Sequence, residues 1–139
     1  MHSSYDLVWY AAERTPDHLA IVDDRSERRL SYRQLIDEVD AVAAGLAARG
    51  VTAGSRFATV LPNLLEHALI LLALARLGAV PALVNARLTP DEVAELVREG
   101  GMQGAIVLPN ADMAKAVAGA LPNGTPLLCA GGEVEGAES

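Results

Sequence analysis

Leu61-Pro-Asn63 opens a mostly apolar stretch that ends in the run Leu77-Gly-Ala-Val-Pro-Ala-Leu-Val-Asn-Ala-Arg-Leu-Thr-Pro-Asp-Glu92. Apolar residues fill positions 64–77 almost without interruption, and glycine follows, which is typical of a buried helix that stops at Gly78. Asn63 stands where such a helix needs an N-cap, so we expect it to fill that role. The stretch therefore predicts a helix over residues 64–77.

The second half of the same stretch predicts a strand and another helix. Residues 79–84 form an apolar run too short for a helix, which favours a buried strand. Thr89 and Glu92 have the spacing of a capping box, and Pro90 occupies the first helical position between them. We therefore expect a helix from Pro90 to about Arg98.

The alternation of strand and helix continues on both sides of this stretch. We expect four strands, over residues 56–61, 79–84, 104–108 and 126–130. A third helix is expected after Asn110 and should end near Leu121. Strands that are short and apolar throughout are typical of a parallel sheet covered on both faces. The pattern predicts an α/β fold with a β-α-β-α-β-α-β layered sheet and right-handed crossovers.

The amino-terminal part predicts helices and a hairpin. Ser3 or Ser4 can cap a helix that ends near Arg14, with one apolar face made of Leu7, Val8, Ala11 and Ala12. Residues 18–23 and a short run from Leu30 should pair as a hairpin around the charged residues 24–29. Ser31 and Gln34 form a second capping box, and apolar residues then recur at helical spacing until the stop signal Arg49-Gly50.

Composition excludes several classes of protein. The 139 residues are 51% hydrophobic, which is enough for a core, and the formal net charge of -7 argues against a nucleic-acid partner or an acidic membrane surface. The longest apolar run, Ala68–Ala75, has 8 residues, whereas a membrane span needs roughly 20. A single cysteine, Cys129, cannot form a disulfide within the chain and is expected in the core. We therefore expect a cytoplasmic protein.

No self-contained catalytic or metal site is evident in the sequence. The only lysine, Lys115, lies in a predicted helix with no glycine-rich loop before it, so we interpret it as a solvated surface residue. Gly100-Gly101 follows a helix and is interpreted as a helix stop. His2, His18 and His67 form no pair at ligand spacing. We predict no catalytic residue and no metal ligand in this chain.

Arg87 is the one candidate binding residue. It follows the carboxyl end of the predicted strand 79–84, and ligands of parallel α/β sheets bind at that edge. Its guanidinium could form a bidentate pair with a phosphate. The alternative left open is that Arg87 pairs with an acid such as Asp91, while Asn85 caps a turn.

Residues 11–108 resemble the start of the adenylate-forming (AMP-binding) enzyme superfamily. Seven marks carry the resemblance in the expected order: Arg14-Thr-Pro-Asp17, Ala20-Ile-Val-Asp23, Leu30-Ser-Tyr-Arg-Gln-Leu35, Ala43-Ala-Gly-Leu46 with Gly50-Val51-x-x-Gly54, Leu61-Pro-Asn63, Leu77-Gly-Ala-Val80 and Asn85-Ala-Arg-Leu-Thr89. The stretch from Arg76 to Leu88 is most similar to benzoate- and chlorobenzoate-type aryl-CoA ligases and to medium-chain acyl-CoA ligases. Peptide-synthetase adenylation domains usually differ at this place.

The resemblance implies a parent enzyme that adenylates a carboxylic acid, aryl or medium-chain, and passes the acyl group to CoA. ATP, Mg²⁺ and CoA would be its cofactors, but the ATP loop and the catalytic lysine lie downstream, so the chain alone is expected to bind none and to be inactive. Residues 1–130 would be the amino-terminal subdomain of the large domain, and 131–139 a flexible tail or truncation point. Arg87 would lie near the phosphates of CoA.

Two other functional interpretations stay open at this level. The chain could be a stand-alone, non-catalytic α/β binding domain, or part of a peptide-synthetase adenylation domain. If it is a fragment of a ligase, apolar surface that the rest of the enzyme would cover favours self-association, so a homo-oligomer is an expected state.

Overall fold

The computed structural model describes residues 3–139, and the chain divides into two compact units that are each discontinuous in sequence. Unit 1 consists of Met1–Thr52 and Leu64–Gly78, and unit 2 consists of Ala53–Asn63 and Ala79–Ser139.

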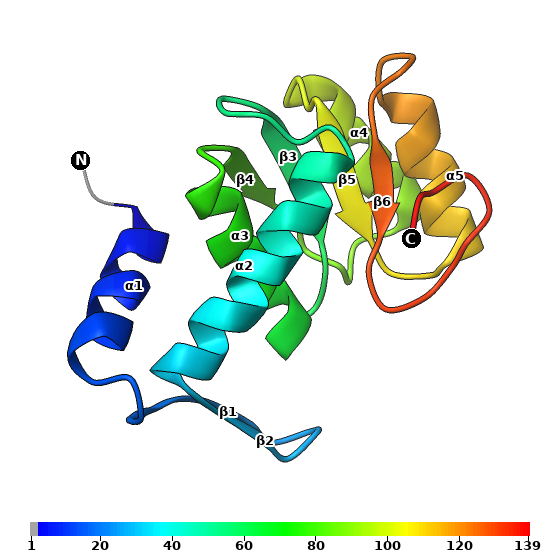
Figure 1. Cartoon of the computed structure of the whole chain (residues 1–139). Coiled ribbons are helices and arrows are strands. Elements are labelled where there is room, and N and C mark those ends of the chain that lie inside the picture. The colour runs from blue at the N-terminus through cyan, green and yellow to red at the C-terminus, as the bar shows by residue number, and fades with distance from the viewer. Residues whose placement is uncertain (1–2) are drawn as a thin grey trace. The chain divides into compact units, whose positions relative to one another are not determined.

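Unit 1 contains three helices and a hairpin (Figure 1): α1 Ser4–Arg14, β1 Leu19–Asp23, β2 Arg28–Ser31, α2 Tyr32–Ala48 and α3 Leu65–Arg76. Ser3 caps α1 and Ser31 caps α2, each within a complete capping box. The strands β1 and β2 are antiparallel, as expected for a hairpin. The apolar stripe of α2 is buried and α2 packs against α3, so the helical periodicity identified the inward face correctly.

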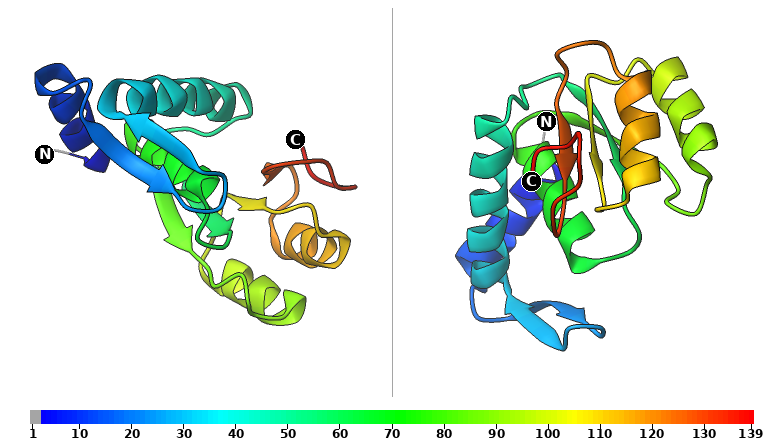
Figure 2. Two further views of the ribbon diagram at one scale, coloured as in Figure 1. Left: turned by 90° about the horizontal axis from the view of Figure 1, so that it is seen from below. Right: turned by 90° about the vertical axis from the view of Figure 1, so that its right-hand side faces the viewer.

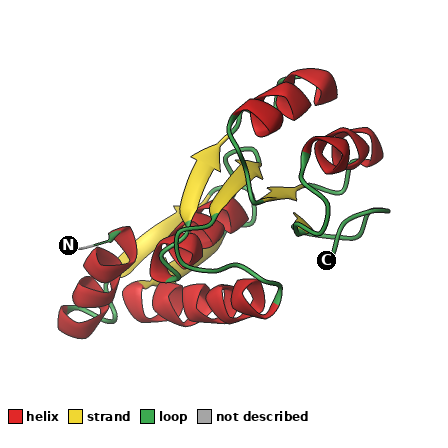
Figure 3. Cartoon of the chain, turned by 90° about the horizontal axis from the view of Figure 1, so that it is seen from above, coloured by secondary structure: helices red, strands yellow, loops and turns green. Residues whose placement is uncertain are grey.

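Unit 2 is a parallel sheet with two helices: β3 Arg56–Val60, β4 Val80–Leu83, α4 Pro90–Glu99, β5 Gly104–Val107, α5 Ala111–Ala120 and β6 Leu127–Cys129. The strand order is β4-β3-β5-β6, and every neighbouring pair is parallel. The helices α4 and α5 lie side by side on one face of this sheet (Figures 2 and 3). The predicted α/β class and the four parallel strands are thus confirmed.

The core of unit 2 lies between the sheet and these two helices. Valines of β3 and β5 that share one register position, Val60 and Val107, contribute to it from the sheet side. Val93, Val97 and Val117 contribute from the helices and are essentially inaccessible to solvent. Burial of this apolar surface is the main stabilising term of the unit.

A glycine permits close packing where the chain enters β5. Gly104 is in register with Phe57 of β3, and a side-chain carbon at position 104 would overlap the Phe57 ring. Just before it, Gly100 and Gly101 end α4 as expected, with Gly101 at φ 62° in the left-handed region. Gly100 and Gly101 thus end a helix, whereas Gly104 makes room for the ring of Phe57.

Two local expectations were wrong. Asn63 does not cap α3: Leu64 is the N-cap residue, and it makes no side-chain cap hydrogen bond. The chain stays extended one residue longer than the cap preference of asparagine indicates. The helix α1 has no buried residue, and its side chain at Leu7, expected on the apolar face, is 67% exposed.

The two edges of the unit 2 sheet are built differently. At one edge, the backbone N–H groups of Val80 and Val84 point toward β3, where they bind Ser55 and Thr59. Pro81 therefore lies at a position whose N–H would face outward, and proline has none. At the other edge, Glu138 pairs in parallel with Leu128 of β6. The assignment of residues 131–139 to a flexible tail stays a prediction.

Candidate binding edge and helix groove

The carboxyl ends of all four strands of unit 2 meet at one edge of the sheet, because the strands are parallel. The segments that follow them are 61–63 after β3, 84–88 after β4, 108–110 after β5 and 130–132 after β6. In open parallel sheets, ligands bind in the crevice outside this edge. The carboxyl edge of the unit 2 sheet is therefore the candidate binding site.

The segment after β4 holds Arg87 in a defined turn. The side-chain oxygen of Asn85 accepts a hydrogen bond of 2.9 Å from the backbone N–H of Arg87, and its carbonyl accepts one of 3.2 Å from Leu88. Ala86 and Leu88, on either side of Arg87, pack against the core of unit 2, whereas Arg87 is exposed. The turn thus anchors the loop at two points and directs the arginine outward.

The guanidinium of Arg87 is available to a ligand. Within residues 3–139 it forms no ion pair, so the predicted alternative in which Asp91 neutralises it is not observed. The other half of that alternative is confirmed, since Asn85 does cap the turn. An exposed, unpaired guanidinium on an anchored loop can bind a phosphate or a carboxylate in bidentate fashion.

The tripeptide Leu-Pro-Asn follows both central strands, β3 and β5. Because Val60 and Val107 are in register, the two copies occupy equivalent positions on the carboxyl edge. Their asparagines differ: Asn110 caps α5 by accepting a 3.0 Å hydrogen bond from Met113, whereas Asn63 is exposed and caps no helix. Asn110 therefore has a structural role as a helix cap, whereas the side-chain amide of Asn63 is exposed at the carboxyl edge of the sheet, where a ligand could reach it.

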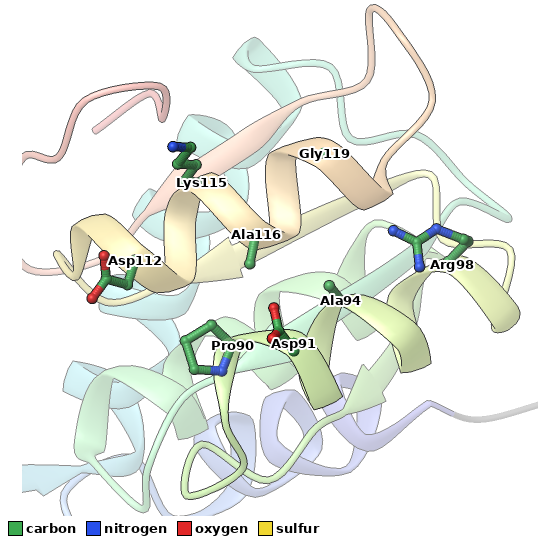
Figure 4. Close-up of a pocket in the computed structure, with 8 residues that line it drawn as sticks. All are labelled: Pro90, Asp91, Ala94, Arg98, Asp112, Lys115, Ala116 and Gly119. Atoms are coloured by element: carbon green, nitrogen blue, oxygen red, sulfur yellow. The ribbon is translucent and has the colours of Figure 1, made fainter.

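A groove runs between α4 and α5 with a volume of about 450 Å³ (Figure 4). Its floor contains small residues, Ala94, Ala116 and Gly119, and its walls carry the charged side chains of Asp91, Arg98, Asp112 and Lys115. Lys115 is exposed on α5, as its interpretation as a surface residue requires. No acid pairs with it within residues 3–139.

No metal centre is evident in the described part of the chain, where no group of three or more histidine, cysteine or acidic residues comes together. His67 is buried in α3 and His18 is exposed before β1, while His2 lies outside the described residues. Cys129 is buried, as expected, and burial raises the pKa of its thiol. A thiol of this kind is a poor nucleophile.

A polar cluster in unit 1 was missed by sequence reasoning. The Tyr5 hydroxyl donates a 2.8 Å hydrogen bond to Asp40, whose carboxylate also accepts a contact of 3.1 Å from Arg76. The guanidinium of Arg76 lies 5.5 Å from the centre of the Tyr5 ring. Burial, then the bond to Asp40, raises the pKa of Tyr5. The cluster joins α1, α2 and α3, and its members are too far apart in sequence for any spacing rule to reveal them.

No helix within residues 3–139 is both long and apolar enough to span a lipid bilayer.

Comparison with known proteins gives consistent matches. The AMP-binding enzyme family matches residues 8–134. A 4-chlorobenzoate–CoA ligase of Arthrobacter sp. is 42% identical over 103 residues, which is 74% of this chain and 20% of the relative. An acetyl-coenzyme A synthetase of Parvibaculum lavamentivorans is 38% identical over 98 residues, covering 68% and 15% of the two chains. The chain thus spans about a fifth or less of these relatives.

A solved structure agrees with the fold as a whole. The N-terminal domain of FACL13 from Mycobacterium tuberculosis superposes with a TM-score of 0.82 and 26% identity, over 94% of this chain and 34% of that one. The expected resemblance to the amino-terminal region of adenylate-forming enzymes is therefore confirmed.

Proposed function

Because the chain belongs to the AMP-binding enzyme family, we propose that it is the amino-terminal subdomain of an ATP-dependent carboxylate–CoA ligase. The observation that carries the proposal is the match of residues 8–134 to the family, together with 42% identity to a 4-chlorobenzoate–CoA ligase. The same relative supports an aryl carboxylic acid as the substrate class, with a medium-chain acyl acid as the alternative.

The proposed reaction has two steps. In the first, a carboxylate oxygen attacks the α-phosphorus of ATP, an acyl–adenylate bond forms, and pyrophosphate leaves. In the second, the CoA thiolate attacks the acyl carbon, a thioester forms, and AMP leaves. ATP, Mg²⁺ and CoA are thus the cofactors of the intact ligase. Residues 3–139 contain no glycine-rich loop with a lysine that could hold the ATP phosphates. The chain by itself is therefore proposed to be inactive.

Arg87 is the residue of this chain that we assign to cofactor binding. Its guanidinium is exposed and unpaired within residues 3–139, and it stands beyond the carboxyl end of β4. These properties fit a contact with a phosphate group of CoA. The contact would position CoA for the second step and would not take part in adenylation. The remainder of the ligase would supply the catalytic groups, and the reducing cytoplasm suits a chain with one buried cysteine.

A chimera tests the proposal directly. The matching amino-terminal segment of the Arthrobacter 4-chlorobenzoate–CoA ligase is replaced by this chain, and the chimera is assayed for ATP–pyrophosphate exchange and for thioester formation. Both activities are expected, whereas the isolated chain should show neither. A chimera that folds, binds ATP and still forms no adenylate would contradict the ligase subdomain and favour a stand-alone binding domain. Activity only with a pantetheinyl carrier protein would favour a peptide-synthetase adenylation domain.

The role of Arg87 has its own readout in the same chimera. Arg87→Ala is expected to raise the KM for CoA about tenfold, since a charge-assisted contact is worth roughly 1.5–3 kcal/mol. Pyrophosphate exchange should stay near the unmodified rate. Arg29→Ala, an exposed arginine of β2, is the matched control and should change neither value. A loss confined to pyrophosphate exchange would contradict the assignment to CoA.

A further inference from the structure

The groove between α4 and α5 carries two charges of each sign that have no partner in the described part of the chain. Asp91, Arg98, Asp112 and Lys115 all line the groove, and none forms an ion pair within residues 3–139. The chain as a whole has a net charge of -7, so two copies repel each other on average. The charges of the residues that line the groove, in contrast, cancel, because two of them are negative and two are positive.

The two charged residues of α4 are spaced for an antiparallel partner. Asp91 is in the first turn of the helix and Arg98 in the last, and both project on the groove side (Figure 4). Seven residues, about 10 Å of helix, separate them, so they are too far apart to pair with each other. A second α4 that runs antiparallel across the first would bring its Arg98 to Asp91 and its Asp91 to Arg98.

The shape of the groove permits that approach. Ala94 lies between the two charged residues and close to the point where a two-fold axis would pass. Ala116 and Gly119 of α5 are equally small, so the floor of the groove leaves room for a second helix. A two-fold arrangement uses the same patch on both partners, and a patch with opposite charges at its two ends complements itself.

We propose that the α4–α5 groove is the contact surface between two copies of this chain, related by a two-fold axis, with Asp91 of each copy paired with Arg98 of the other. Each helix has 10 residues and is therefore only about 15 Å long. A contact of that size lies at the low end of specific interfaces. The dimer is accordingly weak, forms in proportion to concentration, and loosens as salt screens its ion pairs. The inference does not depend on the proposed enzymatic function.

Complementary charge variants test this contact in the purified chain by sedimentation equilibrium over a range of concentrations. Asp91→Arg leaves two arginines in each groove, and Arg98→Asp leaves two aspartates. Each variant alone is expected to raise the dissociation constant about tenfold or more, because both pairs become repulsive. An equimolar mixture of the two restores both pairs and is expected to restore the dimer. Misfolding or a local change within one of the variants could not produce this recovery, because it requires contact between the two different chains.

The controls separate the groove from general charge effects and from unfolding. Glu135→Arg makes the same charge change as Asp91→Arg at an exposed position outside the groove and is expected to leave association unchanged. Circular dichroism verifies that each variant is folded. If a reversal unfolds α4, the neutral substitutions Asp91→Asn and Arg98→Gln take its place, and each should weaken the dimer by a smaller factor.

Three results would overturn the proposal. If the wild-type chain stays monomeric at every concentration, the groove is not a contact between two copies of this chain. A dimer that persists in both single variants places the contact elsewhere on the surface. A mixture of two folded variants that does not associate excludes the antiparallel pairing of Asp91 with Arg98.

Discussion

The side-chain oxygen of Asn85 lies 2.9 Å from the backbone nitrogen of Arg87 and accepts its N–H. Together with the bond from the Leu88 N–H to the Asn85 carbonyl, it fixes the turn that separates an exposed arginine from Leu88, which packs on the core of unit 2. The position of the candidate binding residue therefore depends on a side chain that need not touch any ligand.

Asn85→Ala is expected to free this turn. Loss of the side-chain acceptor should lower the free energy of unfolding by about 1 kcal/mol and speed hydrogen exchange at the Arg87 amide. Asn85→Asp keeps the acceptor and should keep the exchange slow. Amide exchange followed by NMR measures both. Asn123→Ala, in an exposed turn, is the control, and equal exchange at Arg87 in all variants would show that the bond does not order the loop.

Tyr5→Phe tests the cluster that joins the helices of unit 1. The substitution removes the hydroxyl that binds Asp40 but keeps the ring beneath Arg76. We expect a loss of about 0.5–1.5 kcal/mol in the free energy of unfolding, measured by urea titration. Tyr10 is 57% exposed and its hydroxyl accepts a bond from Arg14, so Tyr10→Phe should cost less. Equal costs at the two tyrosines would mean that the Asp40 bond contributes no more than this exposed bond does.

Gly104→Ala is expected to destabilise unit 2 by overpacking. The added methyl group would overlap the ring of Phe57, and such overlaps typically cost about 1–3 kcal/mol. Phe57→Leu in the same chain should relieve part of that cost, so the two effects are not additive. Gly119→Ala is the matched control, because no atom lies near the position of its new methyl group. Thermal unfolding of the four variants checks the prediction.

Stability is expected to fall as the pH rises above about 9, the ordinary pKa of a thiol. Burial raises the pKa of Cys129, so the unfolded chain loses this proton at a lower pH than the folded chain does. The contribution of the protonated Cys129 thiol to stability is complete at pH values below its pKa in the unfolded chain. It is lost as the pH rises to its pKa in the folded chain. Tyr5, whose pKa is also raised, acts in the same direction nearer pH 10.

Urea titrations at pH 8 and pH 10 measure this loss. Cys129→Ala removes one titrating group and should reduce the difference between the two pH values, although the smaller side chain lowers stability at both. An unchanged difference would assign the loss to other groups. A thiol reagent offers a second readout, since the buried Cys129 should react only through opening of the fold.

The sequence predicted the order of elements well because its local signals agree with the tertiary structure. The capping boxes at Ser31 and Thr89 begin helices where expected, and Gly100 ends one. The continuous apolar runs of β3 and β5 are buried, as their interpretation as central parallel strands requires. Local propensity and burial point to the same elements in these segments.

The failures come from contacts that no local pattern encodes. Asparagine is a preferred N-cap residue, yet Leu64 and not Asn63 is the N-cap of α3, so the helix begins one residue later than expected. In the cluster of Tyr5, Asp40 and Arg76, the first two residues are already 35 positions apart in the sequence, so no local pattern predicts their contact. For the candidate site, the position of Arg87 followed from the end of a strand, but its turn and its lack of an acidic partner within residues 3–139 required the structure.

The two edges of the unit 2 sheet bear on how the protein avoids polymerising. An open strand edge is a template onto which another chain can add, and short apolar strands such as β4 and β6 are suited to it. Pro81 removes an outward donor from the β4 edge. At the β6 edge, Glu138 supplies the partner itself: its backbone N–H binds Leu127, and its carbonyl accepts the N–H of Cys129 at 2.7 Å. Proteolytic cleavage between β6 and Glu138 would therefore expose a growth point for fibrils, with no residue of the core altered.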